Sequence, residues 1–127
     1  MQGIPSITLF GASVALGSFL GWQYLKRVKM SPTLVGLHLV AGAAGIETMV
    51  MLRGELPEGV AAGAGGIGNI AAILLVAAML TGFLTPLIAQ KRPRKVGSTA
   101  LAVHFGAGLL GYLLLLAWLA GLPAPVL

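Results

Sequence analysis

The chain has 127 residues, of which 57% are hydrophobic and only 9% are charged, and its mean hydropathy is +0.97. This composition excludes a soluble domain and indicates an integral membrane protein. Cysteine is absent, which excludes disulfides, thiolate metal sites and iron–sulfur ligation.

Four apolar runs each approach the ~20 residues that an α-helix needs to cross the hydrocarbon layer. They cover about residues 4–24, 33–52, 70–89 and 99–119. Little chain remains for anything else, so we expect residues 1–127 to form a single transmembrane domain. Glycine is abundant, at 19 residues, and small residues let membrane helices approach closely. The sequence therefore predicts an all-α protein, a tight four-helix transmembrane bundle.

The first residues, MQGIPSITLF, lack the basic region of a secretory signal, so we expect the first span to be retained as a helix. In the second span Pro32 stands in the first turn, where its missing N–H costs nothing. His38 and Glu47 follow. Nine residues turn an α-helix by about 180°, so Glu47 belongs to a different face from His38.

The charged residues predict the orientation of the spans. Arg53, Glu55 and Glu58 lie together between spans two and three, and the glycine-rich remainder of that segment, up to Asn69, is expected to be a flexible connector. The other seven basic residues lie in the two loops on the opposite side: Lys26, Arg27, Lys29, Lys91, Arg92, Arg94 and Lys95. The positive-inside rule places these basic loops in the cytoplasm and both termini outside, in a bacterial-type cytoplasmic membrane. This distribution argues against nucleic acid as the partner of the net charge of +5.

One stretch occurs twice, as TLVGLHLVAGAAG from Thr33 and as TALAVHFGAGLLG from Thr99. Aligned on His38 and His104, the chain's two histidines, both copies have Thr five residues before and Gly four and seven residues after. Those offsets return to one face of a helix, so each imidazole adjoins a strip without side chains, Gly42 and Gly45 or Gly108 and Gly111. Aligning the basic loops also places Gly17 over Gly82. The pattern predicts a duplicated helical hairpin with a parallel pseudo-two-fold repeat.

Two histidines at one depth in a membrane call for a common explanation, because buried polar side chains are expensive there. Neutral imidazoles from two facing helices can bind one haem iron from both sides, with glycines near each ligand making room for the porphyrin. We therefore expect His38 and His104 as metal ligands. Gly17, Gly42, Gly82 and Gly108 would border the macrocycle, while Thr33 and Thr99 would orient imidazole N–H groups or meet propionates.

This arrangement resembles membrane b-type cytochromes, whose four-helix bundles carry paired histidines on helices two and four and glycines on helices one and three. The resemblance implies one haem b per chain, near the cytoplasmic face. Those proteins commonly hold two haems, and this chain has no outer histidine pair. An electron-transfer subunit is thus favoured over a stand-alone enzyme, exchanging electrons with quinone, a redox partner protein or a larger membrane complex.

Two alternatives stay open. A small duplicated transporter could bind a proton or cation at Glu47, although this leaves the matched histidines without a role. An accessory subunit of a larger membrane complex could hold one chlorin pigment on each histidine. An absorption spectrum would separate these hypotheses.

Overall fold

The computed structural model describes residues 3–122, apart from the side chains of residues 89 and 90, and this part of the chain is helical without a strand. The expected limits of the domain, 1 and 127, lie outside the described residues. Each of four long helices is long and apolar enough to cross a membrane, which suggests a multi-pass membrane protein. These helices are α1 (Ile4–Lys26), α2 (Pro32–Glu55), α4 (Ile67–Lys91) and α5 (Arg94–Ala120).

All four expected spans are confirmed as helices, and each extends a few residues beyond its apolar run because flanking polar residues continue the helical hydrogen bonding. The glycine-rich connector, expected to be flexible, contains the short helix α3 (Glu58–Ala62) and the 3₁₀ turn η1 (Ala64–Gly66). Gly63, Gly65 and Gly66 have φ of 72°, 62° and 75°, a region that residues with a Cβ rarely adopt, so glycine is what lets the chain turn here.

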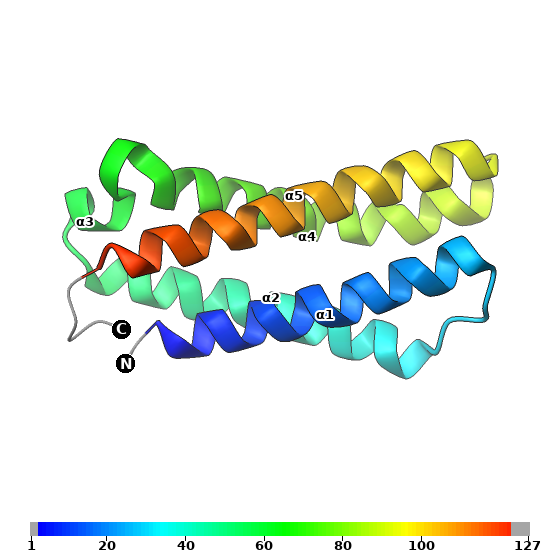
Figure 1. Ribbon diagram of the computed structural model, residues 1–127, viewed down its shortest axis with the longest axis horizontal. Helices are drawn as coiled ribbons and strands as arrows, with labels where there is room; N and C mark the ends of the chain where they lie inside the picture. The colour runs from blue at the N-terminus through cyan, green and yellow to red at the C-terminus, as the bar shows by residue number, and fades with distance from the viewer. Residues whose placement is uncertain (1–2, 123–127) are drawn as a thin grey trace.

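The long helices form two antiparallel hairpins, α1 with α2 and α4 with α5 (Figure 1). Each hairpin is closely packed internally, and the two meet along α1 with α5 and along α2 with α4. It follows that α2 and α5 are diagonal in the bundle. The start of α1, the end of α5 and α3 lie at one end, here named the α3 end, and the basic loops lie at the other, the basic end (Figure 1).

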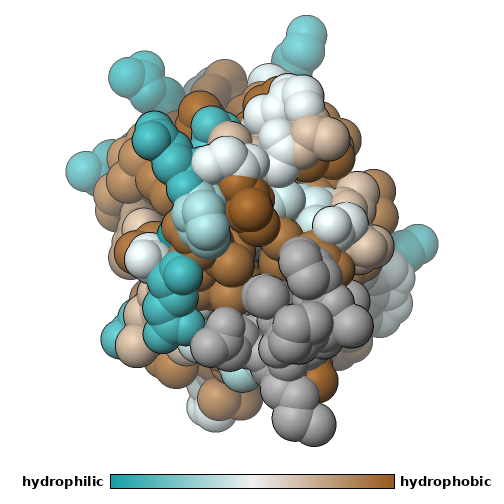
Figure 2. Space-filling view, turned by 90° about the vertical axis from the view of Figure 1, so that its left-hand side faces the viewer, coloured by the Kyte–Doolittle hydropathy of each residue, from teal (hydrophilic) through white to brown (hydrophobic). Residues whose placement is uncertain are grey.

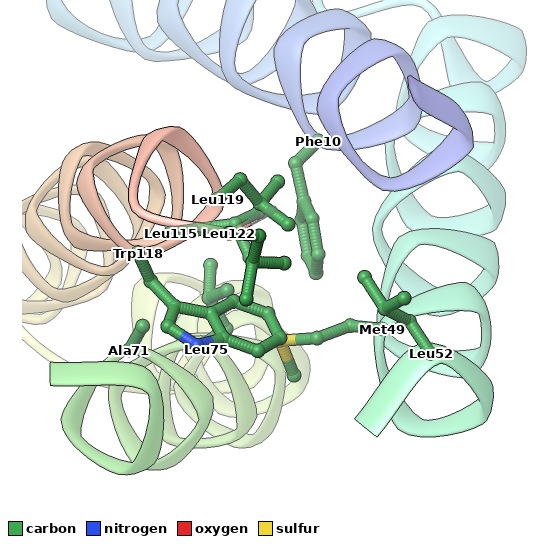
Figure 3. Packing of buried hydrophobic residues seen from close by; sticks show 9 residues of the cluster. All are labelled: Phe10, Met49, Leu52, Ala71, Leu75, Leu115, Trp118, Leu119 and Leu122. Atoms are coloured by element: carbon green, nitrogen blue, oxygen red, sulfur yellow. The ribbon is translucent and has the colours of Figure 1, made fainter. Parts of the chain in front are cut away.

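A closed apolar cluster holds the four helices together toward the α3 end (Figure 3). Met49, Leu115 and Leu119 are its most completely enclosed large side chains, 1%, 0% and 1% exposed. Burial of this kind stabilises a fold through tight packing as well as removal from water. The remaining members are Phe10, Leu52, Ala71, Leu75, Trp118 and Leu122.

Arg53 and Trp118 fasten the connector over this cluster. The Arg53 guanidinium lies 5.7 Å from the centre of the Trp118 ring and donates a hydrogen bond of 2.6 Å to the carbonyl of Ala61. The Trp118 indole N–H donates to the carbonyl of Val60 at 3.1 Å. A side chain at Gly63 would collide with the same ring, since a Cβ there would lie 2.7 Å from it. The connector therefore covers the cluster at the α3 end, where hydrophilic residues lie beside an apolar centre (Figure 2).

Candidate functional site

A cavity of about 210 Å³ lies between the two hairpins, from the middle of the bundle toward the basic end. All four long helices line it, and its walls repeat. Four residues of α1 line the cavity, and the residue 65 positions after each of them, on α4, also lines it. Five lining residues of α2 correspond in the same way to residues of α5 that stand 66 positions later. The matched pairs are Phe10 and Leu75, Ser13 and Ala78, Val14 and Met79, Gly17 and Gly82, Val35 and Leu101, His38 and His104, Leu39 and Phe105, Gly42 and Gly108, and Ala43 and Leu109.

His38 and His104 are held in the same way within their own hairpins. His38 Nδ1 lies 2.8 Å from the backbone carbonyl of Ser13 on α1, and His104 Nδ1 lies 2.8 Å from that of Ala78 on α4. A carbonyl oxygen only accepts hydrogen bonds, so Nδ1 is the protonated nitrogen in each neutral imidazole. The lone pair is then on Nε2, which makes no hydrogen bond within the described residues. Each ring thus has an Nε2 lone pair without a hydrogen-bond partner among the described residues.

The two imidazoles approach each other across the bundle although their helices are diagonal. Their ring centroids are 5.9 Å apart and their planes are inclined by 86°. Both side chains are partly buried and both line the cavity. The pair is therefore the polar centre of an otherwise largely apolar cavity.

Gly17 and Gly82 make room for the histidines themselves. A Cβ on Gly17 would lie 2.8 Å from Cε1 of His38, and a Cβ on Gly82 would lie 2.8 Å from Cε1 of His104. Such distances are too short for real contacts, so each imidazole occupies the space that its glycine leaves. Both glycines also line the cavity, as expected, but their first neighbour is the ring of the same hairpin.

Gly42 and Gly108 line the cavity and bring the helices of each hairpin together. A Cβ on Gly42 would lie 3.2 Å from Ser13 Oγ, and one on Gly108 would lie 3.6 Å from the Cβ of Ala78. The close approach of α2 to α1, and of α5 to α4, is what brings the Ser13 and Ala78 carbonyls within reach of the histidines. These glycines therefore position the imidazole rings indirectly.

The threonines do not orient the imidazoles, which corrects one of the two roles expected for them. Thr33 and Thr99 are exposed and lie outside the lining of the cavity. Thr99 Oγ1 donates to the carbonyl of Lys95, at 2.9 Å, on its own helix. Backbone carbonyls accept the hydrogen bonds of the imidazole N–H groups instead, because the close helix contacts at the glycines bring these carbonyls nearer to the rings.

Sequence reasoning missed the two hydroxyl side chains that lie near the histidines on the neighbouring helices. Ser13 Oγ lies 3.2 Å from His38 Nδ1, and Thr81 Oγ1 lies 3.5 Å from His104 Nδ1. Ser13 stands four residues before Gly17, on the same helix face, which could have identified it. The group at Ala78 that accepts the hydrogen bond of His104 is a backbone carbonyl, and a pattern of side chains does not predict such a partner.

Pro86 interrupts the hydrogen bonding of α4 at the wall of the cavity. It has no N–H to donate to the carbonyl of Gly82, four residues earlier. Thr85 Oγ1 donates to the carbonyl of Thr81, at 2.8 Å, and so does not replace the missing bond. The matched position on α1 is Gly21, which keeps its N–H.

Glu47 lies away from this site. Its side chain is exposed on the outside of the bundle and does not line the cavity, in agreement with the expectation that it is not a partner of His38. Among residues 3–122 no group of three His, Cys, Asp or Glu side chains gathers into a metal site.

No known protein family, curated protein or solved structure matches the chain. The geometry of the cavity and its histidines is therefore the basis for the function proposed below.

Proposed function

We propose that this protein is a membrane b-type cytochrome-like electron-transfer protein or subunit that binds one haem b between His38 and His104. The observation that carries the proposal is that the two imidazoles have the same hydrogen bonding and the same tautomer. In each, the Nδ1–H donates a hydrogen bond to a backbone carbonyl oxygen, with 2.8 Å between nitrogen and oxygen, and Nε2 makes no hydrogen bond within the described residues. Metal-ligating histidines usually donate their other N–H in this way, which fixes the tautomer and makes the ligand more basic.

The spacing of the rings supports one metal between them. Metal–nitrogen bonds of about 2 Å on both sides of one ion place two imidazole centroids roughly 6 Å apart. The observed separation is 5.9 Å. Two metals, each on its own histidine, would need a larger gap, so the distance favours one shared macrocycle over one chlorin per histidine. A transporter centred on Glu47 receives no support from the cavity, because Glu47 does not line it.

We further propose that the bundle is a duplicated hairpin whose pseudo-two-fold axis runs along the membrane normal. The contacts recur with the same offsets as the sequence: Gly17 seats His38 as Gly82 seats His104. Gly45 faces Phe10 as Gly111 faces Leu75, in both cases with a hypothetical Cβ 3.0 Å from the nearest atom. Such a repeat would supply one histidine from each hairpin to a single metal between them.

Haem iron would supply reversible one-electron transfer. The chain's own contribution is to hold two neutral imidazoles at a fixed spacing and to surround them with apolar residues that exclude water. Thr33 and Thr99 keep their second expected role, as contacts for propionates. Electrons would be exchanged with quinone in the membrane, with a redox partner protein, or within a larger membrane complex.

Absorption spectroscopy of the purified protein, expressed with ample haem, tests the proposal. If His38 and His104 together hold the haem, we expect the sharp reduced bands of a low-spin b-type cytochrome and one haem per chain. His38→Ala and His104→Ala should each give a high-spin or haem-free protein, and the double variant should be no worse than either, because the ligands act on one metal as a unit. Glu47→Gln is the control and should retain the spectrum. Colourless wild-type protein would refute haem binding, and two pigments per chain would support the chlorin alternative.

The proposed orientation, with the basic end in the cytoplasm, rests on the positive-inside rule. Reporters fused at Arg94 should be active inside the cell, and reporters fused at Ala61 should be active outside. Inverted labelling would place the haem in the opposite leaflet without affecting the assignment of its ligands.

A further inference from the structure

A second pocket, of about 430 Å³, lies at the basic end and shares no residue with the central cavity. It is formed where the end of α1 and the following loop meet the first residue of α5. Three of its six lining residues are cationic and a fourth carries a phenol. The lining consists of Tyr24, Arg27, Val28, Lys29, Met30 and Arg94.

Arg94 is fixed in place by α1. It donates a hydrogen bond of 3.1 Å to the carbonyl of Leu25, and its guanidinium lies 6.0 Å from the centre of the Tyr24 ring. These contacts use one of the five N–H donors of the side chain and one face of the ring. The remaining donors and the Tyr24 hydroxyl stay available to a molecule in the pocket.

Arg27 occupies a backbone position that normally belongs to glycine. Its φ is 58°, and it is the one non-glycine residue with positive φ in the described part of the chain. The N–H groups of Val28 and Arg27 bond to the carbonyls of Gln23 and Tyr24, the paired bonds that close a helix around a left-handed residue. A side chain there costs about 1 kcal/mol relative to glycine.

The pocket has no carboxylate to balance its charge. The acidic residues Glu47, Glu55 and Glu58 belong to the second half of α2 and to α3, away from the basic end. Three cations that converge on one pocket without an acidic partner favour an anionic ligand, and arginine forks match phosphate oxygens particularly well. We propose that this pocket binds a phosphate group. Its place at the ends of membrane-length helices favours the headgroup of an anionic phospholipid over free phosphate.

A phosphate bound here would link the two hairpins. Arg27 and Lys29 belong to the first hairpin and Arg94 to the second, so one anion contacting all three would add a connection at the end where the apolar cluster is absent. The expected consequence is a higher melting temperature when the ligand is present.

Thermal unfolding in nanodiscs tests the proposal. Wild-type protein should melt roughly 4 °C higher in phosphatidylglycerol-containing discs than in pure phosphatidylcholine discs. The pocket variant Arg27→Gln/Lys29→Gln should lose most of this shift. The control variant Arg92→Gln/Lys95→Gln removes the same two residue types at the same end but outside the pocket, and it should keep the shift. A third arm adds inorganic phosphate to phosphatidylcholine discs.

A shift with phosphatidylglycerol alone would assign the site to a lipid headgroup, and an equal shift with inorganic phosphate would assign it to a free anion. Either result supports a phosphate pocket provided that only the pocket variant loses it. No shift, or equal loss in both variants, would overturn the proposal, because general surface charge would then explain the data. Haem content is measured in parallel: haem loss confined to the pocket variant would show that these cations serve the haem instead.

Discussion

The half of the bundle near the α3 end and the half near the basic end are built on the same helices but packed in opposite ways. Near the α3 end, Met49, Leu115 and Trp118 fill the space between the hairpins. In the other half, glycines lie against the two histidines within each hairpin, and a cavity remains between the hairpins. Phe10 and Leu75 belong to both, as members of the apolar cluster and of the cavity lining.

The offset of 66 between α2 and α5 explains what distinguishes these halves. In the cavity it superposes His38 on His104 and Gly42 on Gly108, which are identical, while the other three lining pairs of these two helices differ. In the apolar cluster it superposes different ones: Met49 on Leu115 and Leu52 on Trp118. Packing needs only complementary volumes, which many combinations of side chains supply. Seating an imidazole against a helix backbone needs glycine in both copies.

The largest effect on stability is expected in the packed half. Leu115→Ala should lower the free energy of unfolding by about 2–5 kcal/mol, because Leu115 is 0% exposed and its neighbours cannot collapse fully into the gap. Denaturant unfolding in detergent measures the change. Leu113→Ala, at a side chain that is 53% exposed, is the matched control and should cost much less. If both variants lost the same stability, the α3 end would not be the anchor of the fold.

Next in size is the effect of adding a methyl group in the hollow half. Gly17→Ala or Gly82→Ala should push the adjoining imidazole out of place and lower haem affinity about tenfold, a change of roughly 1.4 kcal/mol. Titration of the apoprotein with haem measures the affinity. Gly36→Ala adds the same methyl group to α2 where nothing lies within 4 Å, so it should bind haem normally. Unchanged affinity in the Gly17 and Gly82 variants would show that the rings move at no cost.

The smallest effect is expected at the connector. Trp118→Phe keeps an aromatic ring but removes the indole hydrogen bond to Val60, and should lower the free energy of unfolding by about 1 kcal/mol without changing the haem spectrum. Trp22→Phe, at a side chain that is 51% exposed, is the control. Thermal melts followed at the haem band report both properties, and a changed spectrum would mean that the halves are coupled.

The sequence was sufficient to predict the four long helices, because apolar runs of membrane length allow few alternatives. It also matched Gly17 with Gly82 through their register, but it did not predict that each of them lies against the histidine ring of its own hairpin. The partners of the imidazole protons were not predictable, since a backbone carbonyl is present at every residue and only helix spacing selects one. The structured connector was missed for a similar reason. Its order depends on Arg53 and Trp118, which lie far apart in the chain.

Pro86 gives the two walls of the cavity different backbone hydrogen bonding. The Gly82 carbonyl lacks its usual helical donor, whereas the matched stretch of α1 contains glycine and keeps every amide. A helix with one bond missing opens at lower free energy, so the last turns of α4 should exchange their amide hydrogens faster than the last turns of α1. A prosthetic group that enters after the bundle has formed would then pass the α4 side, and the rate of its insertion, more than its final affinity, would depend on Pro86.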